Sequence, residues 1–308
     1  MPTETEAIIV GMETNKWAKF EDKADFTIPS GTNQVYNYIG EELMSRDSTD
    51  VMRCSAATMC LKRRQLQRMG TKGTPLTPRK LVNFMLGDLT EKVLNHFIKK
   101  SCVGEGKMYS EVVFGDPKWS FPLQGEDVWI YDQPTWHNKI NEDISITGHP
   151  DGVGKRNSDG KWELIEIKSA ANWGFNSYKK DGPGDYLKQA HALMMCDEAM
   201  ALGIGNVRFW YLRKETGHIW DSSHDYDMAL ANLVLEEYIK TSGNTPIPAP
   251  HHIVPEIKGR GKVKIPTGRK TAKFPCTYCP YLEECHGKFE LDWGKDQFGN
   301  GKPIYLFK

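Results

Sequence analysis

The sequence lacks a long hydrophobic run, an excess of charge of either sign and an even number of cysteines. Charged residues are spread through the first thirty positions, so this segment holds no apolar run long enough for a signal peptide or a membrane span. We therefore expect a cytoplasmic protein with no membrane partner. The formal net charge is zero, so total charge gives no indication of nucleic acid. The 308 residues allow one large domain or two small ones.

The seven cysteines are an odd number, which argues against a disulfide framework and for metal ligation or ordinary burial. Cys276, Cys279 and Cys285 form a CxxC pair with a third cysteine six residues further on. This spacing brings three thiolates around one metal centre, which can be zinc or an iron–sulfur cluster. His286 directly follows Cys285 and is poorly placed as a fourth ligand, so we expect a distant cysteine there.

The charged residues are unevenly distributed along the chain. Residues 51–87 contain no Asp or Glu but eight Lys or Arg, and residues 256–273 contain one acid against seven basic residues. Two such stretches either form a phosphate-binding surface or are solvated loops.

The hydrophobic pattern predicts an α/β fold with a mixed central sheet flanked by helices. A long helix is expected from Pro78 to about Lys100, and a hairpin is expected around the turn Asn157–Gly160. The remaining predicted elements are helices over 55–69, 185–202 and 225–241, strands over 108–114, 140–153, 161–169 and 207–213, a short strand after 217, and a connection over 245–275.

An acidic motif lies in the predicted hairpin. Asp151 ends the run Gly-His-Pro-Asp, and Glu166-Ile167-Lys168 lies on the next strand. Side chains alternate along a strand, so Glu166 and Lys168 point to one face. Two carboxylates, with the Ile167 carbonyl as a further ligand, suit Mg²⁺ or Mn²⁺, and Lys168 can orient or help deprotonate an attacking water. The alternative is a turn aspartate beside a surface Glu/Lys pair.

These residues resemble the signature of the PD-(D/E)xK nuclease superfamily, here Pro150-Asp151 … Glu166-Ile167-Lys168. The resemblance implies a restriction-endonuclease-like core of RecB type. It also implies that Glu91, four residues after Gly87, contacts the metal, with His96 as a weaker candidate.

The segment from Tyr186 to Leu193 resembles the QxxxY element of RecB-like and lambda-exonuclease-like nucleases. Gln189 would then contact the site or the DNA backbone. Leu193 stands where that group usually has tyrosine, and Tyr186 is a candidate to replace it. His191 is expected to be a partner in helix packing.

One cysteine ahead of this core and three behind it resemble the iron–sulfur nucleases, namely the CRISPR-associated exonucleases of RecB type and the AddB nuclease domain. The resemblance implies a 4Fe-4S cluster that staples the C-terminal cysteine segment to an N-terminal helix. Cys60 is the expected fourth ligand, Cys54 is the alternative, and zinc is the alternative occupant. The predicted organisation is an N-terminal segment 1–50 of unknown role, a nuclease domain 51–288 with its core at about 78–242, and a tail 289–308.

The resemblance implies a metal-dependent DNA exonuclease, 5′-to-3′, acting on single strands or duplex ends in recombination, repair, phage DNA metabolism or CRISPR adaptation. The expected nucleic-acid contacts are Arg63, Arg64, Trp173 and Tyr186. Trp173, with Phe175 and Tyr178, either stacks on bases or packs as a hydrophobic loop. The alternatives are a structure- or site-specific DNA endonuclease and a non-catalytic DNA-binding protein on a nuclease fold. The possible protein partners are a second copy of this chain and recombination or CRISPR proteins.

Overall fold

The computed structural model describes residues 52–71, 73, 78–123, 125–250, 253–258, 265–272, 276, 279–287, 289–295 and 301–307. The chain divides into two compact units. The larger unit comprises residues 49–68 and 83–246, and the described part of the smaller unit comes from residues 69–82 and from residue 247 onward. The predicted segment 1–50 lies outside the described residues, and the predicted domain boundaries stay predictions.

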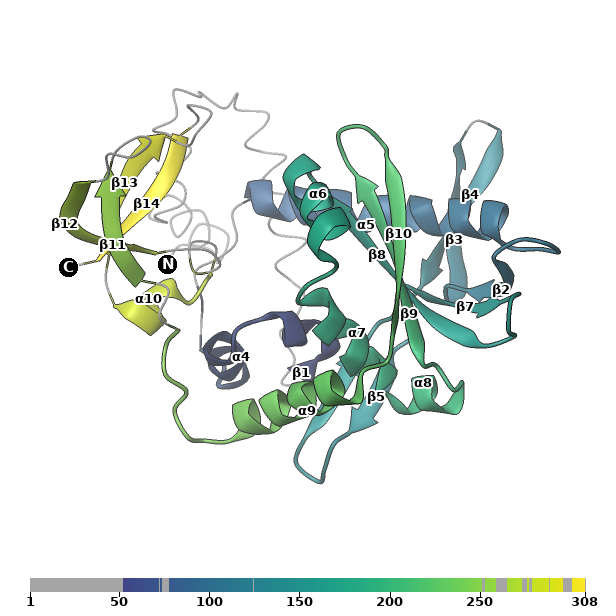
Figure 1. Ribbon diagram of the computed structural model, residues 1–308, viewed down its shortest axis with the longest axis horizontal. Coiled ribbons are helices and arrows are strands. Elements are labelled where there is room, and N and C mark those ends of the chain that lie inside the picture. The colour runs from purple at the N-terminus through teal and green to yellow at the C-terminus, as the bar shows by residue number, and fades with distance from the viewer. Residues whose placement is uncertain are drawn as a thin grey trace, which may run out of the picture. The chain divides into compact units, whose positions relative to one another are not determined.

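A five-stranded mixed sheet in the order β10-β9-β8-β7-β2 forms the centre of the larger unit (Figure 1). Strands β8 and β9 are parallel, and the other neighbours are antiparallel. The strands are β2 (Tyr109–Val113), β7 (Gly152–Arg156), β8 (Trp162–Ala170), β9 (Asn206–Arg213) and β10 (Ile219–Asp225). The predicted α/β fold with a mixed central sheet is therefore confirmed, and the β7–β8 hairpin turns where expected, with Gly160 at a φ of 68°.

Helices cover both faces of this sheet. Ile165 and Ile167 of β8 pack with Leu94 and Ile98 of α5 (Pro78–Cys102). The alternate residue Leu164 points to the other face, where the core contains side chains of η1 (Cys54–Thr58), α7 (Tyr186–Met194) and α9 (Met228–Ser242). Two apolar layers thus fix α5 on one side of β8, and α7 and α9 on the other.

Several predicted elements are interrupted. The predicted strand 140–153 ends at Gly148 because Pro150 cannot donate a ladder hydrogen bond, and its first part, β6 (Ser145–Gly148), joins β1 and β5 in a separate sheet. The helix expected over 55–69 breaks where Met59 is extended, at a ψ of 152°. The elements that differ from the prediction are β1 (Met52–Arg53), α4 (Leu61–Arg68), β3 (Asp116–Leu123), β4 (Glu126–Asp132), β5 (Trp136–Lys139), α6 (Asn172–Asp181) and α8 (Asp197–Ala201).

The smaller unit contains a four-stranded antiparallel sheet in the order β11-β12-β14-β13. Its elements are β11 (Ile253–Lys258), β12 (Ile265–Ala272), α10 (Leu282–His286), β13 (Phe289–Lys295) and β14 (Gly301–Phe307). A connection was expected over 245–275, where the Pro, Gly and Lys content hides the pattern of β11 and β12. In the described part of the chain, no helix has the length and apolar character of a membrane span.

Candidate active site

The site lies at a fork in the central sheet, where β7 begins and β8 continues. The β7–β8 pairing starts at Gly152 opposite Ile165, and β8 runs on from Glu166 to Ala170 beside β9. Asp151 precedes β7 and is buried, and its Oδ2 accepts the backbone N–H of Ile167 at 2.6 Å. The carboxylate thus satisfies a strand donor at the point where the β7 partner is missing.

Gly152 fixes where the fork opens. A Cβ atom on Gly152 would lie 2.4 Å from Cδ1 of Phe114, closer than real atoms approach. Only glycine lets β7 start directly against the Phe114 ring, which places Asp151 at the fork.

Glu166 and Lys168 share one side of β8, as the alternation predicts. The Lys168 Nζ donates to Glu166 Oε2 at 2.7 Å, and Gln189 Nε2 from α7 donates to the same oxygen at 3.3 Å. The Lys168 Nζ lies 5.1 Å from the centre of the Tyr186 ring, on the same helix as Gln189. Tyr186 therefore lies beside Lys168, and its replacement of the missing QxxxY tyrosine stays a prediction.

The electrostatics of this pair follow from its burial. Glu166 is fully buried, and burial together with the Asp151 charge raises the pKa of its carboxyl to about 7 against the opposing effect of Lys168. Burial disfavours the Lys168 ammonium, but the Glu166 and Asp151 charges outweigh it and raise the pKa of Lys168. The other Glu166 oxygen, Oε1, is buried and has no hydrogen-bond partner among the residues that the structure describes.

Glu91 reaches the same place from α5. Gln133 Nε2 lies 2.8 Å from Glu91 Oε1 and 3.0 Å from Asp151 Oδ1, and Lys92 Nζ lies 3.0 Å from the same Glu91 oxygen. Burial and the Asp151 charge raise the pKa of Glu91 to about 8, although Lys92 and Lys168 oppose the shift. Neither Gln133 nor Lys92 is among the predicted site residues. Gln133 follows a hairpin that was not predicted, so no local sequence pattern marks it.

The residues at the fork fit a hard divalent cation. Three carboxylates, from Glu91, Asp151 and Glu166, supply oxygen donors, and Glu166 Oε1, which no described residue contacts by a hydrogen bond, is an available ligand atom. Burial, with the Asp151 charge as a smaller cause, raises the pKa values of Glu91 and Glu166, and a bound cation would favour their ionised forms. In the described ranges, no three His, Cys, Asp or Glu side chains close around one point. Mg²⁺ is commonly held by one or two carboxylates, with waters and substrate completing its shell.

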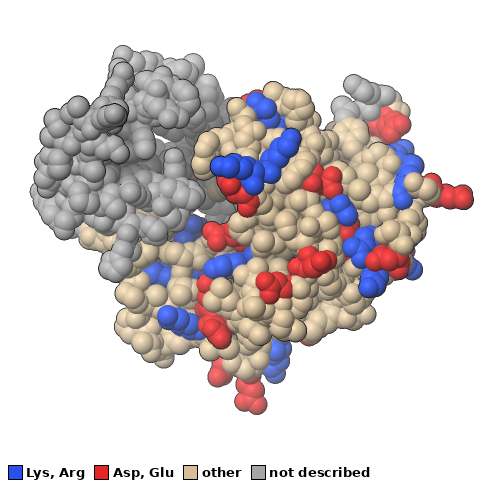
Figure 2. Space-filling model, in the orientation of Figure 1, with Lys and Arg blue, Asp and Glu red and all other residues tan. Residues whose placement is uncertain are grey.

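The aromatic residues expected to contact nucleic acid divide into two kinds. Trp173 on α6 is 83% exposed, whereas Phe175 is buried. Tyr178 packs with Tyr211 at a centroid distance of 5.1 Å and with Tyr186 at 5.8 Å. Trp173 is thus free to stack, and the other two belong to the core. Figure 2 shows basic side chains gathered over α6, and acidic and basic groups mixed over the rest of the visible face.

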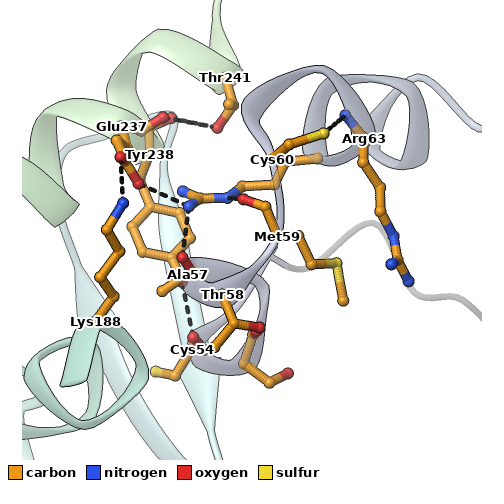
Figure 3. A network of polar contacts seen from close by, with 12 residues as sticks. Cys54, Ala57, Thr58, Met59, Cys60, Arg63, Lys188, Glu237, Tyr238 and Thr241 are labelled. Atoms are coloured by element: carbon orange, nitrogen blue, oxygen red, sulfur yellow. Dashed lines mark hydrogen bonds and ion pairs between the residues drawn. The ribbon is translucent and has the colours of Figure 1, made fainter. Parts of the chain in front are cut away.

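Arg64 is a structural residue and not the nucleic-acid contact that was expected. Figure 3 shows its ion-pair partner Glu237 beside Lys188. Its side chain is 3% exposed, and it donates to the carbonyls of Met59 and Ala57 and to Glu237 Oε2 at 2.7 Å. Glu237 also accepts from Lys188 Nζ of α7 at 2.7 Å. The guanidinium is therefore used within the protein and joins α4, α9 and α7.

Cys60 is partly exposed, whereas Cys54, the alternative fourth ligand, is buried. The Cys60 Sγ accepts the N–H of Arg63 at 3.4 Å and is partly exposed. Cys54 is buried, with its Sγ 3.9 Å from that of Cys196, and this contact and burial raise the pKa of Cys54. Because metals bind the thiolate, Cys60 fits a ligand role better than Cys54 does.

The C-terminal cysteines lie in the smaller unit, around α10. The Cys279 N–H donates to the carbonyl of Cys276 at 3.1 Å, and the Cys276 Sγ lies 3.9 Å from His286 Nε2. Cys60 belongs to the larger unit. The expected cluster and the closing of the two segments on each other stay predictions.

The remaining candidates on α5 and α7 have packing roles. His191 is buried, with Nδ1 2.7 Å from the carbonyl of Leu187 and Nε2 accepting the Asp227 N–H at 2.8 Å. Leu193 is buried in the core. His96 lies 3.7 Å from Glu126 Oε2 and takes no part in the contacts at the fork that the structure describes. His191 is thus the packing partner that the sequence predicts.

No family model and no curated protein sequence matches this chain. Among solved structures, SSO0001 is similar at 13% identity over 85% of this chain and 99% of its own, with a TM-score of 0.44. An alkaline exonuclease (LHK-Exo) from Laribacter hongkongensis is similar at 17% identity over 62% and 86%, with a TM-score of 0.36. A phage-related exonuclease from Haemophilus somnus 129PT is similar at 15% identity over 62% and 91%, with a TM-score of 0.30. The functional assignment therefore rests on the residues of the site itself.

Proposed function

We propose that this protein is a divalent-metal-dependent nuclease that hydrolyses DNA phosphodiester bonds at the β7–β8 fork. The observation that carries the proposal is the convergence of Asp151, Glu166 and Lys168 there, with the ammonium of Lys168 2.7 Å from a fully buried carboxylate. A buried acid with an unused oxygen has no structural benefit for a strand, whereas a metal-assisted hydrolase needs one.

Each side chain has a distinct part in the proposed reaction. A bound Mg²⁺ or Mn²⁺ would polarise the phosphoryl oxygen and lower the pKa of a water. Asp151 and Glu166 would hold it, with Glu91 and the Ile167 carbonyl as further ligands. Lys168 donates hydrogen bonds that orient the water and offset charge on the phosphate. Gln189 keeps Glu166 Oε2 in place through its 3.3 Å hydrogen bond.

In this proposal the enzyme is an exonuclease that works 5′-to-3′ on single strands or duplex ends of DNA. Its support is the resemblance of the motifs together with the exposed Trp173, which can stack on an unpaired base, and Arg63, which can contact a phosphate. Recombination, repair, phage DNA metabolism and CRISPR adaptation are the processes that such an enzyme would serve.

The test is to incubate end-labelled linear DNA and circular single-stranded DNA with the protein in Mg²⁺ or Mn²⁺. We expect metal-dependent loss of the linear DNA, abolished in Asp151→Ala and Lys168→Ala and unchanged in Asp143→Ala, which removes an exposed carboxylate. Undiminished cleavage by Asp151→Ala would end the assignment. Cleavage of circles would favour the endonuclease alternative, and binding without cleavage the non-catalytic one.

We further propose a 4Fe-4S cluster held by Cys60, Cys276, Cys279 and Cys285. Its support is the cysteine spacing and the accessible thiol of Cys60. An anaerobic preparation should be brown, with absorbance near ~400 nm that Cys60→Ala removes and Cys102→Ala keeps. A colourless protein that contains stoichiometric zinc would refute the iron–sulfur cluster and identify zinc as the bound metal.

A further inference from the structure

Gln133 lies between two of the carboxylates at the fork. It follows β4 directly, in the loop that leads to β5, and it is partly buried. Its amide nitrogen is 2.8 Å from Glu91 Oε1 and 3.0 Å from Asp151 Oδ1. One side chain from an unpredicted hairpin thus bridges α5 and the start of β7.

The Gln133 amide faces the two acids with its NH₂ group. Its nitrogen donates to Glu91 Oε1 and to Asp151 Oδ1, so both acid oxygens act as acceptors. Both N–H donors are then used, one for each acid. The amide nitrogen therefore occupies the point to which one oxygen of each carboxylate is directed.

We propose that Gln133 is the residue that a divalent cation displaces from this site. The inference rests on the metal site of the proposed function. An N–H donor and a cation cannot occupy the same point between Glu91 and Asp151. The two hydrogen bonds consequently exist only in the metal-free protein, where they hold the Glu91 and Asp151 side chains together.

This arrangement makes Gln133 a determinant of metal affinity. Interactions present only in the metal-free state stabilise that state and weaken binding by the same factor. Hydrogen bonds to charged groups are among the stronger ones in proteins, so losing both should tighten cation binding by about tenfold or more.

The test is titration calorimetry of Mn²⁺ into metal-free protein without DNA, comparing the wild type with Gln133→Leu. Gln67→Leu is the control, because Gln67 is an exposed glutamine on α4. We expect Gln133→Leu to bind Mn²⁺ about tenfold or more tightly, and Gln67→Leu to bind as the wild type does. The metal-free Gln133→Leu protein should also unfold at a lower temperature, and saturating Mn²⁺ should narrow the difference.

Two results would overturn the proposal, and one of them would also overturn the proposed metal site. Unchanged or weaker Mn²⁺ binding by Gln133→Leu would refute the displacement of Gln133 and leave the proposed metal site unaffected. No binding by the wild type would end the metal site and the displacement together. If Gln133→Leu does not fold, nuclear magnetic resonance of the wild type tests the displacement through the side-chain amide signal of Gln133. It must move when Mg²⁺ is added, and an unmoved signal in the Mg²⁺-bound protein would refute displacement.

Discussion

Asp151 has two separate contacts, and they can be separated by substitution. Its Oδ2 accepts the Ile167 N–H and its Oδ1 accepts from Gln133. Asparagine keeps one acceptor oxygen but carries no charge, whereas alanine removes both. The residue therefore holds β8 in place and also supplies charge to the candidate metal site.

We expect Asp151→Asn to keep most of the stability while losing Mn²⁺ binding and cleavage. Asp151→Ala should in addition lose about 1–3 kcal/mol, because the Ile167 N–H is left unpaired. Denaturant unfolding of both metal-free variants measures the difference. Equal stability of the two variants would argue that the 2.6 Å contact has no structural role.

The raised pKa values of Glu91 and Glu166 predict that the metal-free protein becomes less stable as the pH rises. Their folded pKa values are about 8 and about 7, above the ordinary 4.5. Between these limits the folded state keeps protons that the unfolded chain has released, so the free energy of unfolding falls with pH. One pKa unit corresponds to about 1.4 kcal/mol, and we expect a total loss of at least about 2 kcal/mol between about pH 5 and pH 8.

Denaturant unfolding without metal across this pH range measures the effect. Glu91→Gln should flatten the profile because its amide does not titrate. Saturating Mg²⁺ should also flatten it by favouring the ionised carboxylates. A profile of the metal-free wild type that is already flat would contradict the assigned shifts.

At the scale of elements, the buried Arg64 pairs with the partly buried Glu237, which also pairs with Lys188, and the three residues connect α4, α9 and α7. Figure 3 shows Glu237 and Lys188 side by side. Removing the charge of Glu237 leaves the Arg64 guanidinium buried and uncompensated. We expect Glu237→Gln to cost about 3–5 kcal/mol, measured by denaturant unfolding, with the exposed Glu236→Gln as the matched control. A loss of unfolding free energy no larger than that of the control would mean that the carbonyls of Ala57 and Met59 suffice to stabilise the buried Arg64 guanidinium.

The elements that the sequence predicts well are those with a strong local signal. The Thr77-Pro78 start and the apolar spacing place α5, and the Asn-Ser-Asp-Gly turn places the β7–β8 hairpin. The sequence does not predict the β3–β4 hairpin, because Pro117 and Pro122 interrupt its strand pattern and prolines are unusual in a hydrogen-bonded ladder. Gln133 follows that hairpin, so its place beside Asp151 depends on long-range packing that no local pattern carries.

The acids of the motif could be predicted for a different reason. Strand alternation alone puts Glu166 and Lys168 on one side of β8, and the resemblance to nuclease motifs adds Glu91 and Gln189 as predictions. Arg64 could not be assigned in this way. A basic run looks the same in sequence whether a given arginine points to solvent or to a glutamate inside the protein such as the partly buried Glu237.

At the scale of the whole molecule, all described contacts of the candidate active site come from the larger unit. Glu91, Gln133, Asp151, Glu166 and Gln189 all lie between residues 83 and 246. The segment 49–68 completes this unit, since Tyr238 of α9 donates to the carbonyl of Arg53 at 2.8 Å.

We therefore expect a chain of residues 49–246 to unfold cooperatively and to bind Mn²⁺ with an affinity within about threefold of the full protein. Calorimetric titration and thermal unfolding check both points. Starting the chain at residue 69 is the control and should abolish cooperative unfolding. Loss of Mn²⁺ binding by a folded 49–246 chain would show that the smaller unit contributes to the site.

The hydrogen bond from Ile167 to Asp151 makes one backbone proton an internal reporter of the state of the site. A carboxylate acceptor at 2.6 Å deshields that proton far more than a neighbouring strand carbonyl would. Its resonance should therefore stand apart from those of the other β8 amides. Protonation, metal capture and substrate arrival all change the electron density on that carboxylate, so a single spectral line can follow each of them without a label or an assay.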